Sequence, residues 1–558
     1  MMRRLRSPWP SLALGLVVLA VIGAGAAVLT LGRAEPGPLV ALDPPRFVEE
    51  ARAAGLAHAY EGDFQFFVGG GVAVFDCDGD ALPDMYVGGG AAPAALFRNR
   101  SEVGGALAFS GEPDATTDLT GVTGAYPLDV DGDAVVDLAV LRRGENVLLR
   151  GLDGCRFERA NEAWGFDGGD AWTTAFSATW EAHAGGPTLA FGNYLEGSNT
   201  DSERLCFDNA LFRPGEGGGY GAPITLSPGW CSLSMLFSDW DRSGARDLRV
   251  SNDRHYYTDY SPGQEQLWRV RVGERPRLYT ADDGWQPLRI WGMGIASHDV
   301  TADGYPDYYL TSQGDNKLQA LADGAADNEG AAAGGPAAPM RPAYRDIALA
   351  ASATAHRPHA GGESLPSTAW HAEFDDVNND GLMDLFVAKG NVEAQQGYAT
   401  RDPNNLLLGQ PDGTFTEAAD DAGIVHFART RGAALADFNL DGMLDVLEVN
   451  RRENVTLFRN VGWGTAAAPA AMGNWLALTP RQSGANPFAI GAWLQVRVRD
   501  TVVERELVVG GGHGGGQLGP VHFGLGRAAA AEVRVIWPDG EVGAWQRFEA
   551  NQAVVIER

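Results

Sequence analysis

Six short segments of the chain carry oxygen-bearing side chains at a fixed spacing. Most of them follow the pattern D-x-[DNT]-x-[DS]-G-x-x-D, in which positions 1, 3, 5 and 9 offer side-chain oxygens and position 7 offers its backbone carbonyl. This ligand set suits a hard cation of the size of Ca²⁺, whereas Mg²⁺ keeps several of its waters. The flanking residues are strand-like (VAV, MYV, LFV, VLEV), which excludes an EF-hand with its two helices. We therefore expect about six structural Ca²⁺ ions.

The expected ligands share these five positions in each segment. They are Asp76, Asp78, Asp80, Leu82 and Asp84; Asp129, Asp131, Asp133, Val135 and Asp137; Asp239, Asp241, Ser243, Ala245 and Asp247; Asp299, Thr301, Asp303, Tyr305 and Asp307; Asp376, Asn378, Asp380, Leu382 and Asp384; and Asp437, Asn439, Asp441, Met443 and Asp445. The glycine stands at position 6 in the last four segments and at position 4, as Gly79 and Gly132, in the first two.

Each segment lies between two apolar stretches, so the pattern is an internal repeat. The interval from Asp129 to Asp239 is about twice the interval from Asp76 to Asp129, and a further copy from Ala175 fills it. That copy keeps the apolar stretches but carries Trp180, Ala182, Ala184 and Thr188 at the ligand positions. The sequence therefore predicts seven repeats, six with an intact loop.

Repeats of this length, each with several short strands, are typical of β-propeller blades. We expect an all-β chain with a seven-bladed propeller over 34–462, six or eight blades being the alternatives, and an Ala-, Gly- and Pro-rich insertion at about 320–342. The strand-like stretch at Phe47 is expected to close the ring with the last repeat. A linker over 463–473 and a small β-sandwich-like domain over 474–558 follow, because WLQVRVRD and AEVRVIW alternate like strands.

The N-terminal segment 1–33 has arginines before a long apolar run, the layout of an export signal. The length of the run favours an uncleaved anchor over a cleaved signal peptide, which leaves the rest periplasmic or extracellular. The formal net charge of −29 argues against nucleic acid as a partner. In an oxidising compartment Cys206 and Cys231 could close a local loop, and Cys77 with Cys155 could join neighbouring repeats, although spacing alone does not fix the pairing.

The loops resemble FG-GAP/VCBS repeats of integrin-α-like propellers. The C-terminal motifs N-W-L at Asn474, A-I-G-A at Ala489, H-F-G-L-G at His522 and W-P-D-G at Trp537 resemble an ASPIC/UnbV domain. The order of the two parts resembles bacterial relatives of cartilage acidic protein. This resemblance implies an extracellular calcium-binding propeller with no established reaction.

Two functions remain open at this stage. The first is a binding or adhesion protein for a protein or glycan ligand. The second is a polysaccharide-active enzyme, a lyase or hydrolase, that would use His255, Tyr256 and Tyr257, or Trp370 with His371. No nucleophile or metalloprotease signature supports the enzyme, so no catalytic residue is assigned. His298, beside Asp299, is a further candidate of this kind, with packing as the alternative. His513 and His522 are interpreted as packing residues of the C-terminal fold rather than as zinc ligands, and the glycine run Gly510–Gly516 as a site of unusual backbone angles or close approach.

Overall fold

The structure is a computed structural model that describes residues 39–195, 206–215, 217–253, 263–322, 340–393 and 395–558. Residues Ala41–Arg558 form one compact unit. The expected signal or anchor at 1–33, the cluster His255–Tyr257 and most of the expected insertion lie outside the described residues. Within the described residues no helix has the length and apolar character needed to cross a membrane.

Seven antiparallel sheets follow one another along the chain, and each sheet is one blade. Blade 1 is β2 (Val72–Phe75), β3 (Asp84–Val87), β4 (Ala95–Asn99) and β5 (Phe109–Gly111); blade 2 is β6 (Val122–Leu128), β7 (Asp137–Arg142), β8 (Val147–Leu152) and β9 (Arg156–Arg159); blade 3 is β10 (Thr173–Thr179), β11 (Thr188–Asn193), β12 (Asn209–Phe212) and β13 (Ile224–Leu226); blade 4 is β14 (Ser232–Ser238), β15 (Asp247–Asn252), β16 (Gln266–Arg269) and β17 (Arg277–Leu278).

The remaining blades have the same order of strands. Blade 5 is β18 (Gly292–His298), β19 (Asp307–Ser312), β20 (Lys317–Leu321) and β21 (Tyr344–Asp346); blade 6 is β22 (Ala369–Asp375), β23 (Asp384–Lys389), β24 (Asn405–Gly409) and β25 (Phe415–Glu417); blade 7 is β26 (Thr430–Ala436), β27 (Asp445–Asn450), β28 (Thr456–Gly462) and, from the N-terminal side, β1 (Arg46–Glu49). The described helices are single turns: η1 (Phe64–Phe66), η2 (Ala281–Asp283) and α2 (Ala419–Ala422).

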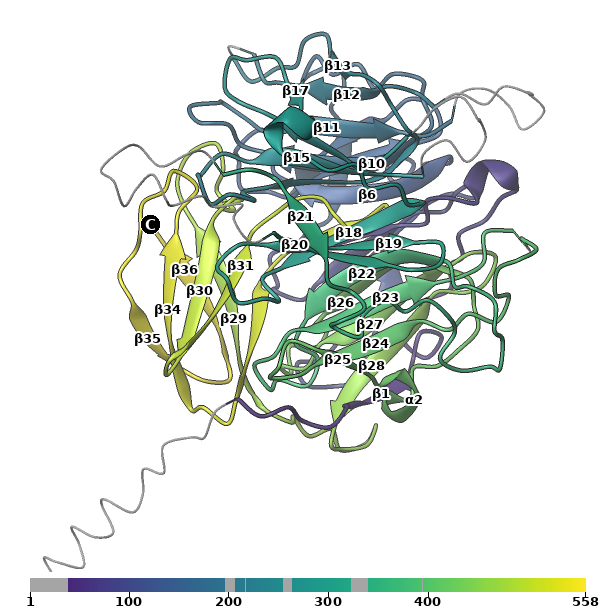
Figure 1. Cartoon of the computed structure of the whole chain (residues 1–558), viewed down its shortest axis with the longest axis vertical. Coiled ribbons are helices and arrows are strands. Elements are labelled where there is room, and N and C mark those ends of the chain that lie inside the picture. Colours follow the sequence, from purple (N-terminus) through teal and green to yellow (C-terminus); the bar gives the residue numbers. More distant parts are fainter. Residues whose placement is uncertain (1–38, 196–205, 216, 254–262, 323–339, 394) are drawn as a thin grey trace, which may run out of the picture. The chain divides into compact units, whose positions relative to one another are not determined.

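The blades close into a ring. The first strands of consecutive blades contact one another around the whole circle, and β26 meets β2 to complete it. These first strands are the innermost ones and are almost entirely buried, as Figure 1 allows the reader to follow. Blade 7 takes its outermost strand from β1, where Phe47 pairs with Asn460. The predictions of seven blades and of ring closure by the segment around Phe47 are both confirmed.

The C-terminal region forms two further sheets that pack as a small sandwich. One sheet has β29 (Asn474–Arg481) between β33 (Val521–Gly526) and β36 (Gln552–Glu557); the other has the order β31 (Thr501–Glu506), β30 (Trp493–Val498), β34 (Ala530–Ile536) and β35 (Gln546–Glu549). Its apolar core is continuous with the core of blades 1 to 3. The expected β-sandwich-like domain is therefore confirmed, and it is packed on the propeller rather than tethered beside it.

The glycine run leaves this domain and enters the centre of the ring. We call residues 508–518 the channel loop; it includes β32 (Gly516–Leu518), which pairs in parallel with β2. The loop hydrogen-bonds to the innermost strands of four more blades: the N–H groups of Ala125 and Ala178 donate to Gly514 and Val509, and those of Gly511 and Gly512 donate to Met235 and Ile295, at 2.6 to 3.0 Å. The propeller channel is thus filled by the protein's own C-terminal domain.

Close packing in the channel explains the glycines. Gly514 has a φ of +67°, which disfavours other residues, and its carbonyl oxygen lies where a Cβ on Gly71 or Gly124 would stand. The neighbouring His513 is completely buried. Its backbone N–H donates to His371 Nδ1 (3.1 Å), and its ring Nε2 accepts from the backbone N–H of Gly69 (3.1 Å). Burial lowers the pKa of His513 to about 3, so this side chain is neutral. The interpretation of His513 as a packing residue is consistent with this position.

Candidate metal loops and the interdomain pocket

The six predicted loops occupy one structural position, between the first and second strands of a blade. The last aspartate of every loop is the first residue of a second strand: Asp84, Asp137, Asp247, Asp307, Asp384 and Asp445. All six loops lie at the end of the ring that faces the C-terminal domain, because each of them has a residue next to that domain. The loops therefore connect the two best-buried strands of their blades.

The first aspartate of each loop organises the turn. Its carboxylate accepts a hydrogen bond from the N–H at position 6, as in Asp376 with Gly381 (2.7 Å) and Asp76 with Ala81 (2.9 Å). Positions 4 and 6 both have positive φ in all six loops, for example +78° at Gly79 and +71° at Ala81. This explains why glycine changes between positions 4 and 6 in the sequence, since it relieves strain at either one.

Carboxylates converge in these loops. In blade 1 the ligand atoms of Asp76, Asp78 and Asp84, and in blade 2 those of Asp129, Asp131 and Asp137, lie within 4.8 Å of one another. In blade 7 the Oδ1 atom of Asn439, at position 3, is buried and has no hydrogen-bond partner. An acceptor-only cluster and an unpartnered buried oxygen are both what a bound cation would satisfy.

Blade 6 has the most buried of these loops. Asp376, Asn378, Asp380 and Asp384 are each at most 1% exposed. Burial, followed by repulsion among the three carboxylates, raises the pKa of Asp376 and Asp384 well above the usual range. Within the described part of the chain no ion pair joins these carboxylates to a basic side chain. The loop residues fit a divalent cation, which would remove this repulsion.

Blade 3 shows what replaces the loop chemistry where the motif is lost. Glu181 accepts from the Thr188 hydroxyl (2.7 Å) and from Arg213 Nε (2.6 Å), so that an arginine neutralises the single acid of this turn. Trp180, at the first ligand position, donates from Nε1 to Ala485 of the C-terminal domain (2.6 Å). The degenerate copy is therefore held by an ion pair and by the domain interface.

All four cysteines are paired. Cys77 bonds to Cys155 and links blade 1 to blade 2. Cys206, between β11 and β12 of blade 3, bonds to Cys231, which lies directly before β14 of blade 4. Both are pairings that the sequence left open. Disulfides of this kind persist in oxidising compartments.

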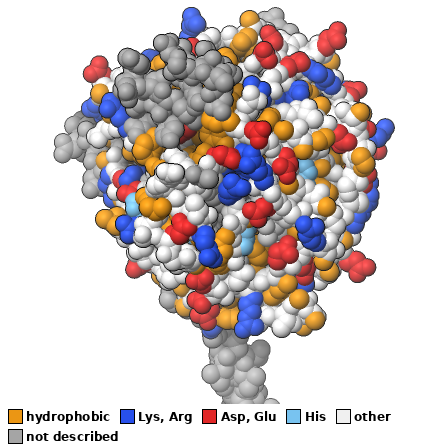
Figure 2. All heavy atoms as spheres, turned by 90° about the vertical axis from the view of Figure 1, so that its right-hand side faces the viewer, with side chains coloured by type: hydrophobic (Ala, Val, Ile, Leu, Met, Phe, Trp, Pro, Cys, Tyr) orange, Lys and Arg blue, Asp and Glu red, His pale blue; other side chains and the backbone are white. Residues whose placement is uncertain are grey.

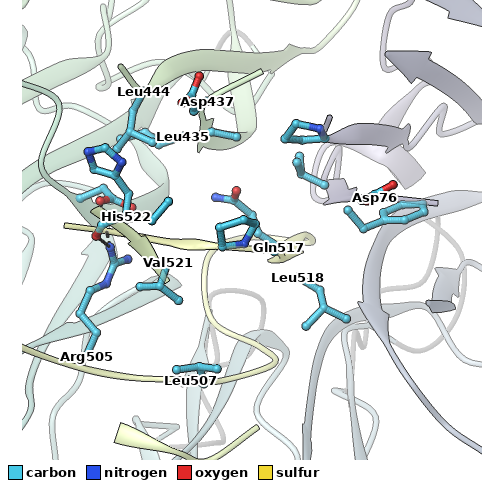
Figure 3. A pocket seen from close by; sticks show the side chains of 18 of the residues that line it. Asp76, Leu435, Asp437, Leu444, Arg505, Leu507, Gln517, Leu518, Val521 and His522 are labelled. Atoms are coloured by element: carbon cyan, nitrogen blue, oxygen red, sulfur yellow. Dashed lines mark hydrogen bonds and ion pairs between the residues drawn. The ribbon is translucent and has the colours of Figure 1, made fainter. Parts of the chain in front are cut away.

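A pocket of about 410 Å³ lies between the loop end of blades 1 and 7 and the C-terminal domain. Figure 3 shows Asp437 and Asp76 in the upper part of the view, and Leu518, Val521 and Leu507 of the C-terminal region below them. Arg505 and His522 form its polar side, and Arg505 is held by Asp375 (2.9 Å). Its lining is mainly apolar, with acids and bases that already have partners.

The candidate catalytic residues within the described chain are structural in this arrangement. Trp370 is fully buried and donates from Nε1 to Gly390 (2.7 Å), while Arg431 lies 4.0 Å above its ring. His371 is 4% exposed and accepts from the channel loop. Neither side chain is open to a polymer substrate. His298 is half-buried, and the burial of its ring lowers its pKa to about 3.

Family models match two parts of the chain. The model described as FG-GAP-like repeat matches residues 376–448, which run from the loop of blade 6 to the start of β27 in blade 7, and the model described as ASPIC and UnbV matches residues 482–558. In sequence the chain is 28% identical to cartilage acidic protein 1 of Homo sapiens over 185 residues, or 32% of this chain and 26% of that protein. It is 34% identical to the protein of the same name from Xenopus tropicalis over 116 residues, or 20% of this chain and 17% of that protein.

The matched segment thus spans about a quarter or less of these relatives. Among solved structures, BBS1N in complex with ARL6DN aligns with 74% of this chain and 97% of its own, at 11% identity and a TM-score of 0.41. An Agrocybe aegerita protein that recognises non-reducing terminal N-acetylglucosamine aligns with 68% of this chain and 88% of its own, at 14% identity and a TM-score of 0.37. The chain carries FG-GAP-like repeats followed by an ASPIC and UnbV domain, and it is related in sequence to cartilage acidic protein 1.

Proposed function

We propose that this protein is an exported, calcium-stabilised propeller that binds a protein or glycan ligand. The observation that carries the proposal is the blade 6 loop, where three buried carboxylates repel one another and have no basic partner among the described residues. Like charges buried in this way repel strongly, and a bound divalent cation would turn the repulsion into attraction. A structural ion in such loops would tie the first two strands of a blade together.

Calcium is assigned to the loops by their oxygen ligands. The side chains at positions 1, 3, 5 and 9 and the carbonyl at position 7 would hold the ion in blades 1, 2, 5, 6 and 7; blade 4 is treated below. Elemental analysis of the purified full chain after dialysis tests this assignment. Absence of bound calcium would refute it.

Export is supported by the two disulfides, because such bonds are rare in reducing compartments. The mass of the non-reduced protein isolated from its native host tests this point. A chain that carries four free thiols in the cell would contradict export.

The ligand is expected on the end of the propeller away from the C-terminal domain. Figure 2 shows this face, where charged side chains of both signs gather near the middle beside apolar ones. The face is built by the loops before the first strands and after the second strands, such as those that carry Arg401 and Arg429. Arg401 lies 4.3 Å above the ring of Phe427, a pairing of guanidinium and aromatic groups that is common at recognition sites.

Binding to a glycan array and to envelope proteins from the native host tests this surface. The double variant Arg401→Glu/Arg429→Glu is expected to lose binding. The matched control Arg499→Glu lies on the turn between β30 and β31 of the C-terminal domain and is expected to retain it. Equal loss in both variants would place the ligand elsewhere.

A further inference from the structure

The blade 4 loop differs from the others at its last aspartate. The Asp247 carboxylate is buried and accepts hydrogen bonds from the Val270 N–H (2.9 Å), Trp240 Nε1 (2.9 Å) and the Tyr279 hydroxyl (2.8 Å). The guanidinium of Arg271 forms an ion pair with it, with one nitrogen on each oxygen. A carboxylate offers about four lone-pair positions. Those of Asp247 are therefore all in use.

The corresponding aspartates of other blades are not saturated. Asp137 accepts from the N–H groups of Val130 and Gly151, both at 2.7 Å, and Asp384 accepts from those of Val377 (3.0 Å) and Gly409 (2.9 Å). Each of these carboxylates uses one lone pair per oxygen and keeps the other. A cation could bind there without displacing a protein contact.

Arginines also approach the loops of blades 1 and 2, but in another way. Arg98 contacts Asp78 and Arg150 contacts Asp131, which stand at position 3. Arg150 is 38% exposed at its side chain, so it can turn into solvent when an ion binds. Arg271 instead contacts position 9, Asp247, whose side chain is 0% exposed. Trp240 and Tyr279 donate hydrogen bonds to the same carboxylate.

The blade 4 loop has a second role that uses its surface. Its Arg242 contacts Glu504 (2.8 Å) and lies 3.6 Å above the Trp493 ring of the C-terminal domain. The N–H of Asp239 donates to Glu506 (3.0 Å), and Arg246 bonds to the Gly491 carbonyl. A loop that already carries arginine at positions 4 and 8 would place positive charge around any incoming Ca²⁺.

We propose that the blade 4 loop binds no calcium, that the guanidinium of Arg271 takes the place of the ion, and that the loop serves instead to hold the C-terminal domain. This inference rests on the proposed calcium sites of the other loops. Blade 4 keeps the ligand motif, but its last carboxylate, at position 9, is neutralised by an arginine of the same blade, as Glu181 is by Arg213 in blade 3.

The test is a calcium count by elemental analysis of the dialysed full chain. The wild-type protein is expected to hold about five ions, one fewer than the loops with the full motif. The variant Asp241→Asn/Ser243→Ala changes positions 3 and 5 of the blade 4 loop, where Asp241 is half-buried and Ser243 is exposed, and is expected to keep the same count. The matched control Asp131→Asn/Asp133→Ala changes the same positions in blade 2 and is expected to lose one ion.

The possible failures are distinct. If the blade 4 variant loses one ion relative to wild type, the inference is overturned and the calcium proposal stands. If no loop holds calcium, the proposed function itself is overturned, together with the inference that rests on it. Neither variant changes a fully buried side chain, so a folded protein is expected in each case, and circular dichroism checks it.

Discussion

The loops of blades 4 and 6 have the same length, the same pair of left-handed residues and the same hydrogen bond from position 6 to the first aspartate. Their last aspartates have different neighbours. Asp384 lies among other carboxylates, whereas Asp247 lies against Arg271, Trp240 and Tyr279. Two loops of one motif can therefore reach charge balance by different means, one by an external ion and one by a side chain. The ligand motif alone does not distinguish them.

Removal of calcium should give the largest loss of stability, and it should affect the blade 6 loop but not the blade 4 loop. With several sites emptied, the melting temperature of the full chain is expected to fall by on the order of 10 °C. Hydrogen exchange should then accelerate at the amides of Gly381 and Asp380 in blade 6 and remain unchanged at Gly244 in blade 4. Equal acceleration in both loops would contradict the comparison.

The second-largest effect is expected when the guanidinium of Arg271 is removed. Arg271→Met leaves Asp247 buried without its partner, which is expected to cost about 3–5 kcal/mol of unfolding free energy. Denaturant unfolding should show the same loss with and without chelator, because no ion is involved. Arg269→Met is the matched control, since Arg269 pairs with Glu274 at the surface and should change stability by less than about 1 kcal/mol.

Loss of a ligand in blade 6 should depend on calcium. Asp384→Asn is expected to cost about 3 kcal/mol when calcium is about 100-fold above its dissociation constant, and much less in chelator. Asp247→Asn should instead lower the unfolding free energy equally in both conditions. Denaturant midpoints of both variants, measured with calcium and with chelator, test this prediction. A calcium-dependent loss of stability for Asp247→Asn would contradict the proposed difference between the two loops.

The smallest effect is expected at the domain interface. Glu504→Gln removes the partly exposed partner of Arg242 and should lower stability by about 1 kcal/mol or less. The change should not depend on calcium, and urea unfolding measures it. A calcium-dependent change would indicate that the blade 4 loop rearranges around an ion.

Much of the fold can be predicted from the sequence because the motif that specifies each hairpin is short and repeated along the chain. Each loop with its two apolar flanks specifies one hairpin, and repetition specifies the number of blades. Propeller architecture predicts that the segment at Phe47 closes the ring, and this segment pairs with β28.

The arginine that neutralises the blade 4 loop is not part of the ligand motif. Arg271 follows the third strand, and only the folded blade brings it to Asp247. A signal was nevertheless present within the loop, DWDRSGARD, where Arg242 and Arg246 stand between the acids and Trp240 follows the first aspartate. The position of the glycine run was similarly hidden, because its partners Val72, Ala125 and Ile295 are distant in sequence.

The channel loop also constrains the order in which the chain can assemble. Residues 508–518 are made after all seven blades, yet they lie inside the circle that β1 and β28 clasp. Either the clasp stays open until the last domain has emerged, or a closed ring must admit the loop through one end. In both cases the propeller completes its interior only late in synthesis. A nascent chain that stops before residue 508 would hold blades whose inner edges still lack their hydrogen-bond partners.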